Sequence, residues 1–208
     1  MNYDSVPLRD FKELNDWETV IFVYQSALKQ VETKIDILNG EFQHRHKYNP
    51  IEHVKSRIKT PESIVKKLKR HGYESSIENM VRYVNDIAGI SISCSFTSDI
   101  YLIADMISKQ NDLTILARRD YMKNPKKSGY RSYHMLVTTP VFLSDSIIDT
   151  KVEIQIRTVA QDFWATLEHK MHYKFEGDGP DYITKELREC ARYVAELDTR
   201  MEELNNEI

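Results

Sequence analysis

The sequence predicts an α+β domain with a long helix at each end. Apolar residues recur by alternating steps of three and four over Leu14–Leu38 and again over Leu187–Ile208, the pattern of a helix with an apolar seam. Val152–Thr158 instead alternates strictly between apolar and polar residues, which indicates a strand with one face in a core. Residues 87–96, rich in β-branched residues, predict a second, buried strand. The 208 residues suit a single domain, 1–208, without repeats or a low-complexity linker.

The composition is that of an ordinary globular protein, with 41% hydrophobic and 29% charged residues. A net charge of −3 gives no overall signal for nucleic acid or membrane binding. The longest uncharged apolar run, Val20–Tyr24, is far shorter than the ~20 residues that cross a bilayer, and no signal peptide is visible. Cys94 and Cys190 lie far apart and fit no metal spacing, so we expect a cytoplasmic protein.

The first helix is expected over about residues 8–39, where Asn39-Gly40 would end it. A polar connection follows up to Pro50 and carries His44 and His46. A metal site there is disfavoured, because neither cysteine nor an acidic residue stands at ligand spacing. The apolar seams of this helix and of the last helix, about 181–208, are narrow, so both helices are expected to drive oligomerisation.

The segment His53–His71 is strongly basic, against the acidic balance of the whole chain. Thr60-Pro61 predicts the start of a short helix that runs to about residue 70. If the residues before it are extended, Arg57 and Lys59 share a face. A run of charges is usually a solvated surface, but its concentration here favours an anion-binding site. The cations are Lys55, Arg57, Lys59, Lys66, Lys67, Lys69 and Arg70.

The middle of the chain alternates short helices and strands. Asp86 stands at the entrance of the strand 87–96, and Gly89 within it suggests a bulge or a close backbone approach. A lysine-rich loop, 122–129, leads through Tyr130-Arg131-Ser132-Tyr133-His134 into the next strand. The other elements are expected as helices over about 76–84 and from Ser98-Asp99 to Gln110, strands over 113–121 and 135–139, and a hairpin through 143–149.

The strand that ends at Thr158 has an unusual polar face, formed by Glu153, Gln155 and Arg157 in a row. This face is either a solvent-facing surface with one Glu–Arg pair or one side of a metal or phosphate site. Thr158 is expected to cap the amphipathic helix that follows, which carries Phe163, Trp164 and Leu167 and runs to about Phe175.

A Gly- and Pro-containing break at 177–180 separates this helix from the last one. Glu168, His169 and His172 lie within the helix before the break. Because the His-Glu-x-x-His order of metalloproteases is absent, we interpret them as helix-surface or supporting residues.

Three features together favour nucleotide chemistry. Asp86 and Glu153 are carboxylates at the edges of apolar strands, and Mg²⁺ typically takes one or two carboxylates with water and substrate phosphates. Basic clusters at 55–70 and 118–131 surround them and carry enough charge for two polyphosphates. Tyr130, between Gly129 and a cation, is placed to stack a base, although alone it reads as a half-buried residue at a strand start.

Four ordered motifs resemble the synthetase domain of the RelA/SpoT family, over roughly Asn49 to Met201. They are Asp86-Ile-Ala-Gly, Gly129-Tyr-Arg-Ser-Tyr-His134, Glu153-Ile-Gln-Ile-Arg-Thr158 and Phe163-Trp-Ala-Thr-Leu-Glu-His169. The length resembles a stand-alone small alarmone synthetase of the RelP type. The resemblance implies a nucleotidyltransferase-like core, a mixed five-stranded sheet surrounded by helices, and a homotetramer.

The family transfers the β,γ-pyrophosphate of ATP to the 3′-hydroxyl of GDP or GTP, which yields ppGpp or pppGpp and AMP in the bacterial stringent response. By resemblance, Asp86 and Glu153 bind Mg²⁺, and Glu153 also draws the proton from the 3′-hydroxyl. The implied ATP-binding residues are Arg57, Lys59, Ser63, Lys67 and Arg70. The implied GDP- or GTP-binding residues are Tyr130, which stacks guanine, with Arg119, Lys126, His134 and Gln155.

Two positions depart from the family pattern. Ser91 stands where the family carries an arginine that stacks on adenine opposite the equivalent of Arg57. Asp162 stands where relatives with an allosteric alarmone site carry asparagine. Two other hypotheses remain: a degenerate homologue that binds nucleotide or RNA without efficient turnover, which Ser91 favours, and a structural helical assembly protein. RNA binding is not itself indicated, and the structural hypothesis leaves Asp86, Tyr130 and Glu153 unexplained.

Overall fold

The computed structural model describes residues 16–174 and 180–207. The predicted helix start near residue 8, Leu14, Ile208 and most of the break at 177–180 therefore lie outside the described residues. The described chain forms one five-stranded sheet in the order β1-β2-β5-β4-β3. Its strands are β1 (Ile51–Ile58), β2 (Ala88–Cys94), β3 (Thr114–Asp120), β4 (Tyr133–Phe142) and β5 (Ile147–Thr158).

The sheet is mixed, which confirms the predicted α+β class. β2 and β5 at its centre are parallel, and every other neighbouring pair is antiparallel. The register sets one row of side chains across the sheet, because Ser91 pairs with Lys55 on one side and with Gln155 on the other. Gln155 in turn pairs with His134. Residues from four strands therefore come together in one row.

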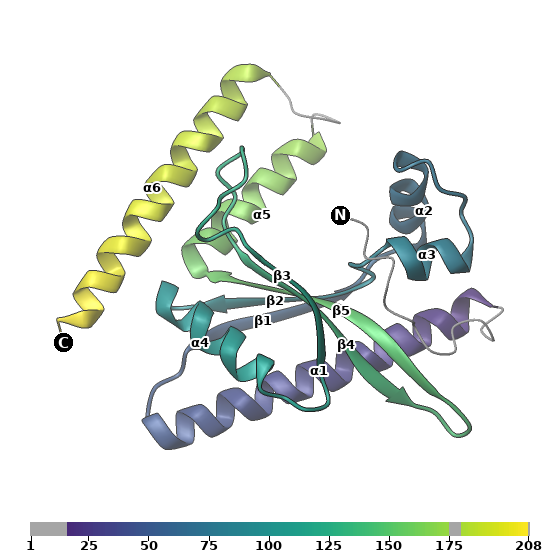
Figure 1. Ribbon diagram of the computed structural model, residues 1–208. Helices are drawn as coiled ribbons and strands as arrows, with labels where there is room; N and C mark the ends of the chain where they lie inside the picture. The colour runs from purple at the N-terminus through teal and green to yellow at the C-terminus, as the bar shows by residue number, and fades with distance from the viewer. Residues whose placement is uncertain (1–15, 175–179, 208) are drawn as a thin grey trace.

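The long helix α1 (Trp17–His46) crosses one face of the sheet (Figure 1). Its seam packs on β1, β2, β4 and β5, and α4 (Thr97–Ser108) adds its isoleucines to the same core. The sheet of the same chain therefore covers this seam, so the apolar stripe from which oligomerisation through the first helix was predicted is not an open surface. The seam residues that are buried are Tyr24, Leu28, Val31 and Ile35.

Helix α1 also ends later than predicted. It runs through Gly40 to His46, so most of the expected polar connection is helical. A glycine in a helix interior costs only about 1 kcal/mol, which continued backbone hydrogen bonding offsets. The helix ends instead at Lys47, whose left-handed φ of 57° lets its N–H donate to the carbonyl of Gln43.

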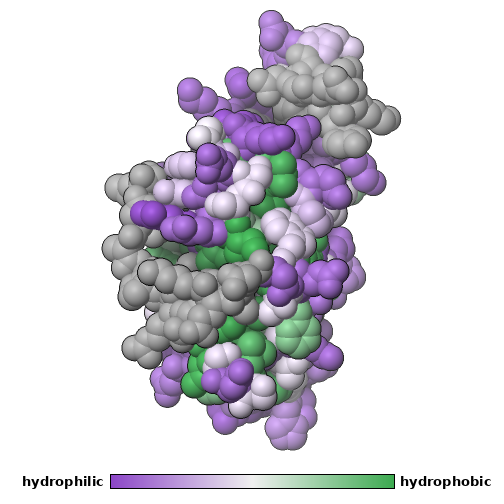
Figure 2. Space-filling view, turned by 90° about the vertical axis from the view of Figure 1, so that its right-hand side faces the viewer, coloured by the Kyte–Doolittle hydropathy of each residue, from purple (hydrophilic) through white to green (hydrophobic). Residues whose placement is uncertain are grey.

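Helices α2 (Pro61–Arg70) and α3 (Ile77–Tyr83) form a separate pair beside one end of the sheet (Figure 1). Thr60 caps α2 as predicted, since its side chain accepts from the Ser63 amide. Seen from the side of this pair, the surface has a band of hydrophobic residues bordered by hydrophilic ones (Figure 2).

The predicted start of α4 at Ser98-Asp99 is wrong, because Phe96 is its N-cap and Asp99 accepts the Phe96 amide 3.1 Å away.

Helices α5 (Val159–Lys174) and α6 (Asp181–Asn206) pack side by side at the other end of the sheet (Figure 1). Thr158 caps α5 as predicted, with its hydroxyl 3.1 Å from the Gln161 amide. Trp164 and Ala191 form a small second core between the two helices. Within the described residues, no helix combines the length and the apolar character that a membrane crossing needs.

Candidate active site

A cleft of about 490 Å³ lies on the face of the sheet opposite α1, with α5 and the loop before β4 along its sides. It brings together residues that the sequence places far apart and that belong to both basic clusters and both acidic positions. The predicted site residues that line it are Arg57, Asp86, Lys126, Tyr130, His134, Glu153 and Gln155, and Ser91 lines it too.

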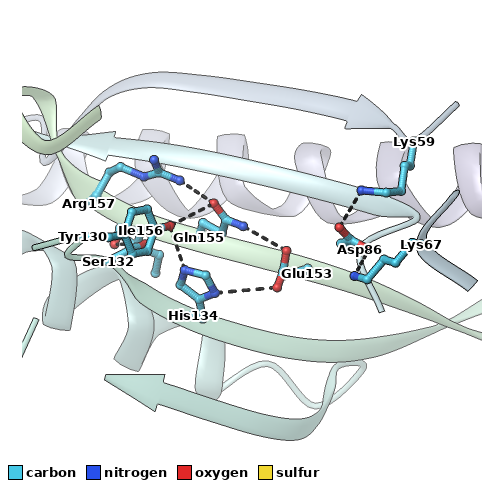
Figure 3. Close-up of polar contacts among 10 residues, drawn as sticks. All are labelled: Lys59, Lys67, Asp86, Tyr130, Ser132, His134, Glu153, Gln155, Ile156 and Arg157. Atoms are coloured by element: carbon cyan, nitrogen blue, oxygen red, sulfur yellow. Dashed lines mark hydrogen bonds and ion pairs between the residues drawn. The ribbon is translucent and has the colours of Figure 1, made fainter. Parts of the chain in front are cut away.

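The polar face of β5 forms the floor of this cleft. Gln155 Nε2 donates to Glu153 Oε2 at 2.9 Å, and Arg157 Nη2 donates to Gln155 Oε1 (Figure 3). Ile154 and Ile156, between these residues, are fully buried on the other face. Strict alternation therefore places the row Glu153–Gln155–Arg157 in the cleft, as the site hypothesis predicts, and not on an open sheet surface.

Glu153 is the carboxylate at the inner end of this row. His134 Nδ1 lies 3.6 Å from its Oε1. Burial would raise the pKa of Glu153, but the polar hydrogens of His134 and Gln155 outweigh it and lower the pKa below its ordinary value. Burial lowers the pKa of His134, although the adjacent Glu153 carboxylate acts in the opposite direction. Glu153 is therefore an ionised carboxylate, available to accept a proton or to bind a cation.

Asp86 is the second carboxylate, and it is held by two lysines from different elements. Lys59, which follows β1, and Lys67 of α2 each place Nζ 2.8 Å from one Asp86 oxygen (Figure 3). Burial would raise the pKa of Asp86, but hydrogen bonds from these two ammonium groups lower it to about 2. The cluster therefore concentrates positive charge beside a carboxylate that is ionised at neutral pH.

Tyr130 stands on the loop side of the cleft. Lys126 Nζ lies 4.6 Å from its ring centroid and the Arg157 guanidinium 5.5 Å away. The Tyr130 hydroxyl lies 2.9 Å from His134 Nε2. Tyr130 fits both of its predicted descriptions in part. Its ring is half-buried next to a strand, and it also lines the cleft. A flat ring beside two cations suits a nucleobase attached to phosphates.

Five predicted residues are not among those that line the main cleft: Lys59 and Lys67, which bind the cleft residue Asp86, and Arg119, Ser63 and Arg70. Arg119 pairs with His134 in the β3–β4 register and lines a smaller cavity, of about 60 Å³, with His134 and Glu153. Ser63 and Arg70 belong to α2, with Lys67, but are not among the residues that line the cleft. The Ser63 hydroxyl accepts from Thr60 Oγ1 at 3.0 Å, within the cap of α2.

Several cleft residues were not assigned to the site by sequence reasoning. Asp162 of α5 bridges the cleft, with Oδ2 3.0 Å from Lys55 Nζ and Oδ1 3.8 Å from Arg157 Nη1. Glu168 and His169 also line the cleft, and their interpretation as helix-surface or supporting residues stays a prediction. The available signal was the spacing of seven residues between Asp162 and His169, which places these two on one side of α5.

The donor set of the cleft fits a magnesium ion. Within residues 16–174 and 180–207, no group of three His, Cys, Asp or Glu side chains is arranged to hold a metal. Asp86 and Glu153 nevertheless line the same cleft. Two carboxylates suffice for Mg²⁺, which completes its octahedral shell with water and substrate phosphates. A zinc-like site made of protein ligands alone does not fit these residues.

Comparison with known proteins identifies the family of this chain. The model of the region found in RelA/SpoT proteins matches residues 56–178. The chain is 44% identical over 195 residues to GTP pyrophosphokinase YwaC of Bacillus subtilis (strain 168), covering 94% of this chain and 93% of that protein. It is 34% identical over 192 residues to GTP pyrophosphokinase YjbM of the same organism, covering 92% and 90%.

Solved structures give the same result. The crystal structure of small alarmone synthetase 2 from Bacillus subtilis has a TM-score of 0.84 at 43% identity, covering 92% of this chain and all of that one. Small alarmone synthetase 1 from the same organism, bound to its product pppGpp, has a TM-score of 0.86 at 33% identity, covering 92% and 97%. The chain therefore belongs to the RelA/SpoT family, and its fold is that of the small alarmone synthetases.

Proposed function

We propose that this protein is an alarmone synthetase that transfers the β,γ-pyrophosphate of ATP to the 3′-hydroxyl of GDP or GTP. The products are ppGpp or pppGpp and AMP, which places the protein in the bacterial stringent response. One observation carries the proposal: a single cleft combines the carboxylates Asp86 and Glu153 with cations from both sides and the ring of Tyr130. The relatives named GTP pyrophosphokinase, and the synthetase bound to pppGpp, support the same reaction.

The donor side of the cleft is proposed at the ends of β1 and α2. Arg57 lines the cleft there, and Lys59 and Lys67 each bind one oxygen of Asp86, which also lines it. Phosphate oxygens of ATP offer the same kind of acceptor, so we assign these residues to the triphosphate. Ser63 and Arg70 remain proposed ATP residues through their place on α2. A synthetase 1 structure bound to AMPCPP, 30% identical with a TM-score of 0.78, supports a donor site in this fold.

We propose that Asp86 and Glu153 hold Mg²⁺ together with the donor phosphates. When bound, Mg²⁺ would neutralise charge on the phosphate oxygens of the transition state. Because Lys59 and Lys67 bind both Asp86 oxygens in this structure, at least one lysine would move from Asp86 to a phosphate as the metal and ATP enter. The lysines therefore serve as charge partners before and after substrate binding.

The acceptor side is proposed at the loop before β4. Tyr130 would stack on guanine, while Lys126, His134 and Gln155 lie around the ring and the Glu153 carboxylate. Arg119 remains a proposed acceptor residue through its pairing with His134 and its place in the smaller cavity. Glu153 would take the proton of the 3′-hydroxyl, since its lowered pKa leaves it ionised. The freed oxygen then forms a bond to the β-phosphorus, the bond from that phosphorus to the α,β-bridging oxygen breaks, and AMP leaves. Transfer of this kind asks for positioning and charge neutralisation and not for a covalent enzyme intermediate.

A transfer assay tests the proposal. Purified protein is incubated with Mg²⁺, ATP and GDP, and the nucleotides are separated by chromatography, with Glu153→Gln as the matched control. The proposal expects ppGpp and AMP from the wild type and orders of magnitude less from the variant. A folded wild-type protein that binds nucleotide without forming product would favour the second candidate, a degenerate homologue, which the small side chain at Ser91 supports.

We also propose that the protein is a cytoplasmic homo-oligomer, a tetramer by family resemblance, with α6 at the contact. In contrast to α1, this helix leaves the C-terminal part of its apolar seam open: Leu197 is 51% and Met201 45% exposed. An exposed apolar stripe of this kind marks an interaction surface. Leu197→Ser combined with Met201→Ser should lower the mass seen by light scattering, with Phe142→Ser, exposed on the distant hairpin, as control. A wild type that stays monomeric at tens of micromolar would contradict the proposal.

A further inference from the structure

The loop that carries Tyr130 rests directly on α6. Ala191 is the buried residue of that helix, at 6% exposure, and it packs with Trp164 and Ala165 of α5. Tyr130, Leu187 and Val194 are partly buried against the same cluster. The ring assigned to the acceptor base therefore has its inner support in a core made by α5 and α6, outside the sheet.

Gly129 makes the closest approach in this contact. A Cβ built on Gly129 would lie 2.5 Å from the Ala191 Cβ, far inside van der Waals distance, whereas the next atoms, on Arg188, would be 3.9 Å away. Gly129 also has a φ of +92°, which side chains with a Cβ rarely adopt. Two backbone hydrogen bonds close the turn around it. The Gly129 N–H donates to the Lys126 carbonyl at 2.8 Å, and the Lys126 N–H donates to the Tyr130 carbonyl at 3.1 Å. The turn is thus in direct contact with Ala191, at the edge of a groove of about 380 Å³ that both residues line.

Helix α6 is fixed firmly enough to serve as such a support. Asp198 accepts from Thr158 Oγ1 at 2.9 Å and from Gln161 Nε2 at 2.6 Å, at the start of α5. One turn later, Glu202 accepts the Ser98 amide at the start of α4. Trp164 Nε1 donates to the Leu187 carbonyl at 2.9 Å. These bonds tie the helix to α4 and to α5, and thereby to the end of β5.

We infer that α6, through the Gly129–Ala191 contact, positions the Tyr130 loop and so sets the affinity for the guanosine acceptor. This inference rests on the proposed function for its ligand, but the contact itself does not. Ala191 is thus a positioning residue: it touches the glycine that precedes Tyr130 and reaches the acceptor only through that loop. The donor side, at β1 and α2, contains none of these contacts, so the effect is confined to one substrate (Figure 1).

A double-mutant cycle between the two residues tests the inference. Ala191→Gly removes one packed methyl group and should raise the KM for GDP about fourfold. Gly129→Ala brings a methyl group into the contact at a positive φ and should raise it about tenfold. In the double variant the space vacated at Ala191 receives the new methyl group, so its KM for GDP should not exceed that of Gly129→Ala alone. The KM for ATP should stay unchanged throughout.

Ala195→Gly is the matched control, because it makes the same change one turn further along α6, at a half-buried position. It should leave both KM values unchanged. Independent effects in the double variant, about fortyfold by multiplication, would overturn the inference. An equal rise in the KM values for ATP and GDP would overturn it too, since it would show a general loss of structure.

Amide hydrogen exchange gives a second reading that needs no activity. In Ala191→Gly the amides of Lys126 and Gly129 should exchange faster than in the wild type, while those of β5 keep their protection. If the wild type makes no alarmone but these amides exchange faster in Ala191→Gly, the proposed function fails and the positioning role of α6 stands. If the enzyme is active and neither exchange nor the KM for GDP changes, the positioning role fails and the proposed function stands.

Discussion

The Tyr130 hydroxyl lies 2.9 Å from Nε2 of His134, whose other ring nitrogen lies 3.6 Å from Glu153. The residue assigned to the acceptor base and the carboxylate assigned to the reaction are therefore joined through one imidazole ring. The hydroxyl also lies 3.4 Å from Gln155 Oε1. Tyr130 consequently has two separate roles to test, one for its ring and one for its hydroxyl.

Tyr130→Ala should raise the KM for GDP about 5- to 150-fold, the effect of losing one stacked aromatic ring. Tyr130→Phe keeps the ring and loses the hydrogen bond to His134, so a rise of about two- to tenfold is expected. From the sequence alone, a ring that only stacks on guanine would predict almost no change in the KM for GDP in Tyr130→Phe. The contact between the hydroxyl and His134 changes that expectation. Steady-state kinetics with each substrate varied will measure both. Equal changes in the KM for ATP would point instead to collapse of the loop.

Glu153→Gln should leave the fold intact and lower kcat by about 10²–10⁴-fold, because the amide cannot take the proton of the 3′-hydroxyl. Asp86→Asn should lose a similar amount and should in addition need more Mg²⁺ for half-maximal activity, since a neutral amide binds the cation weakly. Magnesium titrations of kcat, with circular dichroism as a check on folding, measure both effects. Near-wild-type turnover in either variant at low millimolar Mg²⁺ would remove that residue from its proposed role.

Ser91→Arg should lower the KM for ATP about two- to thirtyfold with little change in kcat, because a guanidinium stacked on adenine acts equally on the ground and transition states. The register places the new side chain beside Lys55, whose charge is already paired with Asp162. Ser91→Gln, which adds length without a guanidinium, is the control. An unchanged KM for ATP in Ser91→Arg would show that the adenine does not lie over this position.

Asp198→Asn tests how Asp198 anchors α6, through the pH dependence of the free energy of unfolding. Burial raises the pKa of Asp198 above its ordinary value of 3.8, despite hydrogen bonds from Thr158 and Gln161. Between 3.8 and the raised value the folded state binds more protons than the unfolded state, so stability falls as pH rises through this window. The wild type should therefore gain stability relative to the variant as pH falls from about 7 to about 4. Urea unfolding at each pH measures this, and a difference that does not vary with pH would refute it.

The polar floor of the cleft could be predicted from the sequence because it depends on local geometry alone. A period of two places Glu153, Gln155 and Arg157 on one side of β5 whatever the rest of the chain does. The cap of α2 at Thr60 and the cap of α5 at Thr158 are local in the same sense, and both predictions are confirmed.

The features that could not be predicted from the sequence depend on contacts between distant segments. The seam of α1 looks like a coiled-coil contact, but whether a sheet or another chain covers it cannot be decided from the helix sequence. Likewise, the salt bridges that join Asp86 to Lys59 and Lys67 link three elements whose packing angle no local pattern specifies. The fit of Gly129 against Ala191 requires the packing of α6 itself. These relationships appear only once the tertiary structure is known.

The most direct test of the central claim follows the phosphates of ATP through the reaction. Two parallel reactions with GDP and Mg²⁺ use ATP labelled at the α-phosphate or at the γ-phosphate. The account predicts that the γ-label appears in ppGpp and that the α-label appears only in AMP, in amounts equal to the ppGpp formed. Release of the γ-label as inorganic phosphate or pyrophosphate, with no labelled guanosine product from folded protein, would contradict pyrophosphate transfer in this cleft.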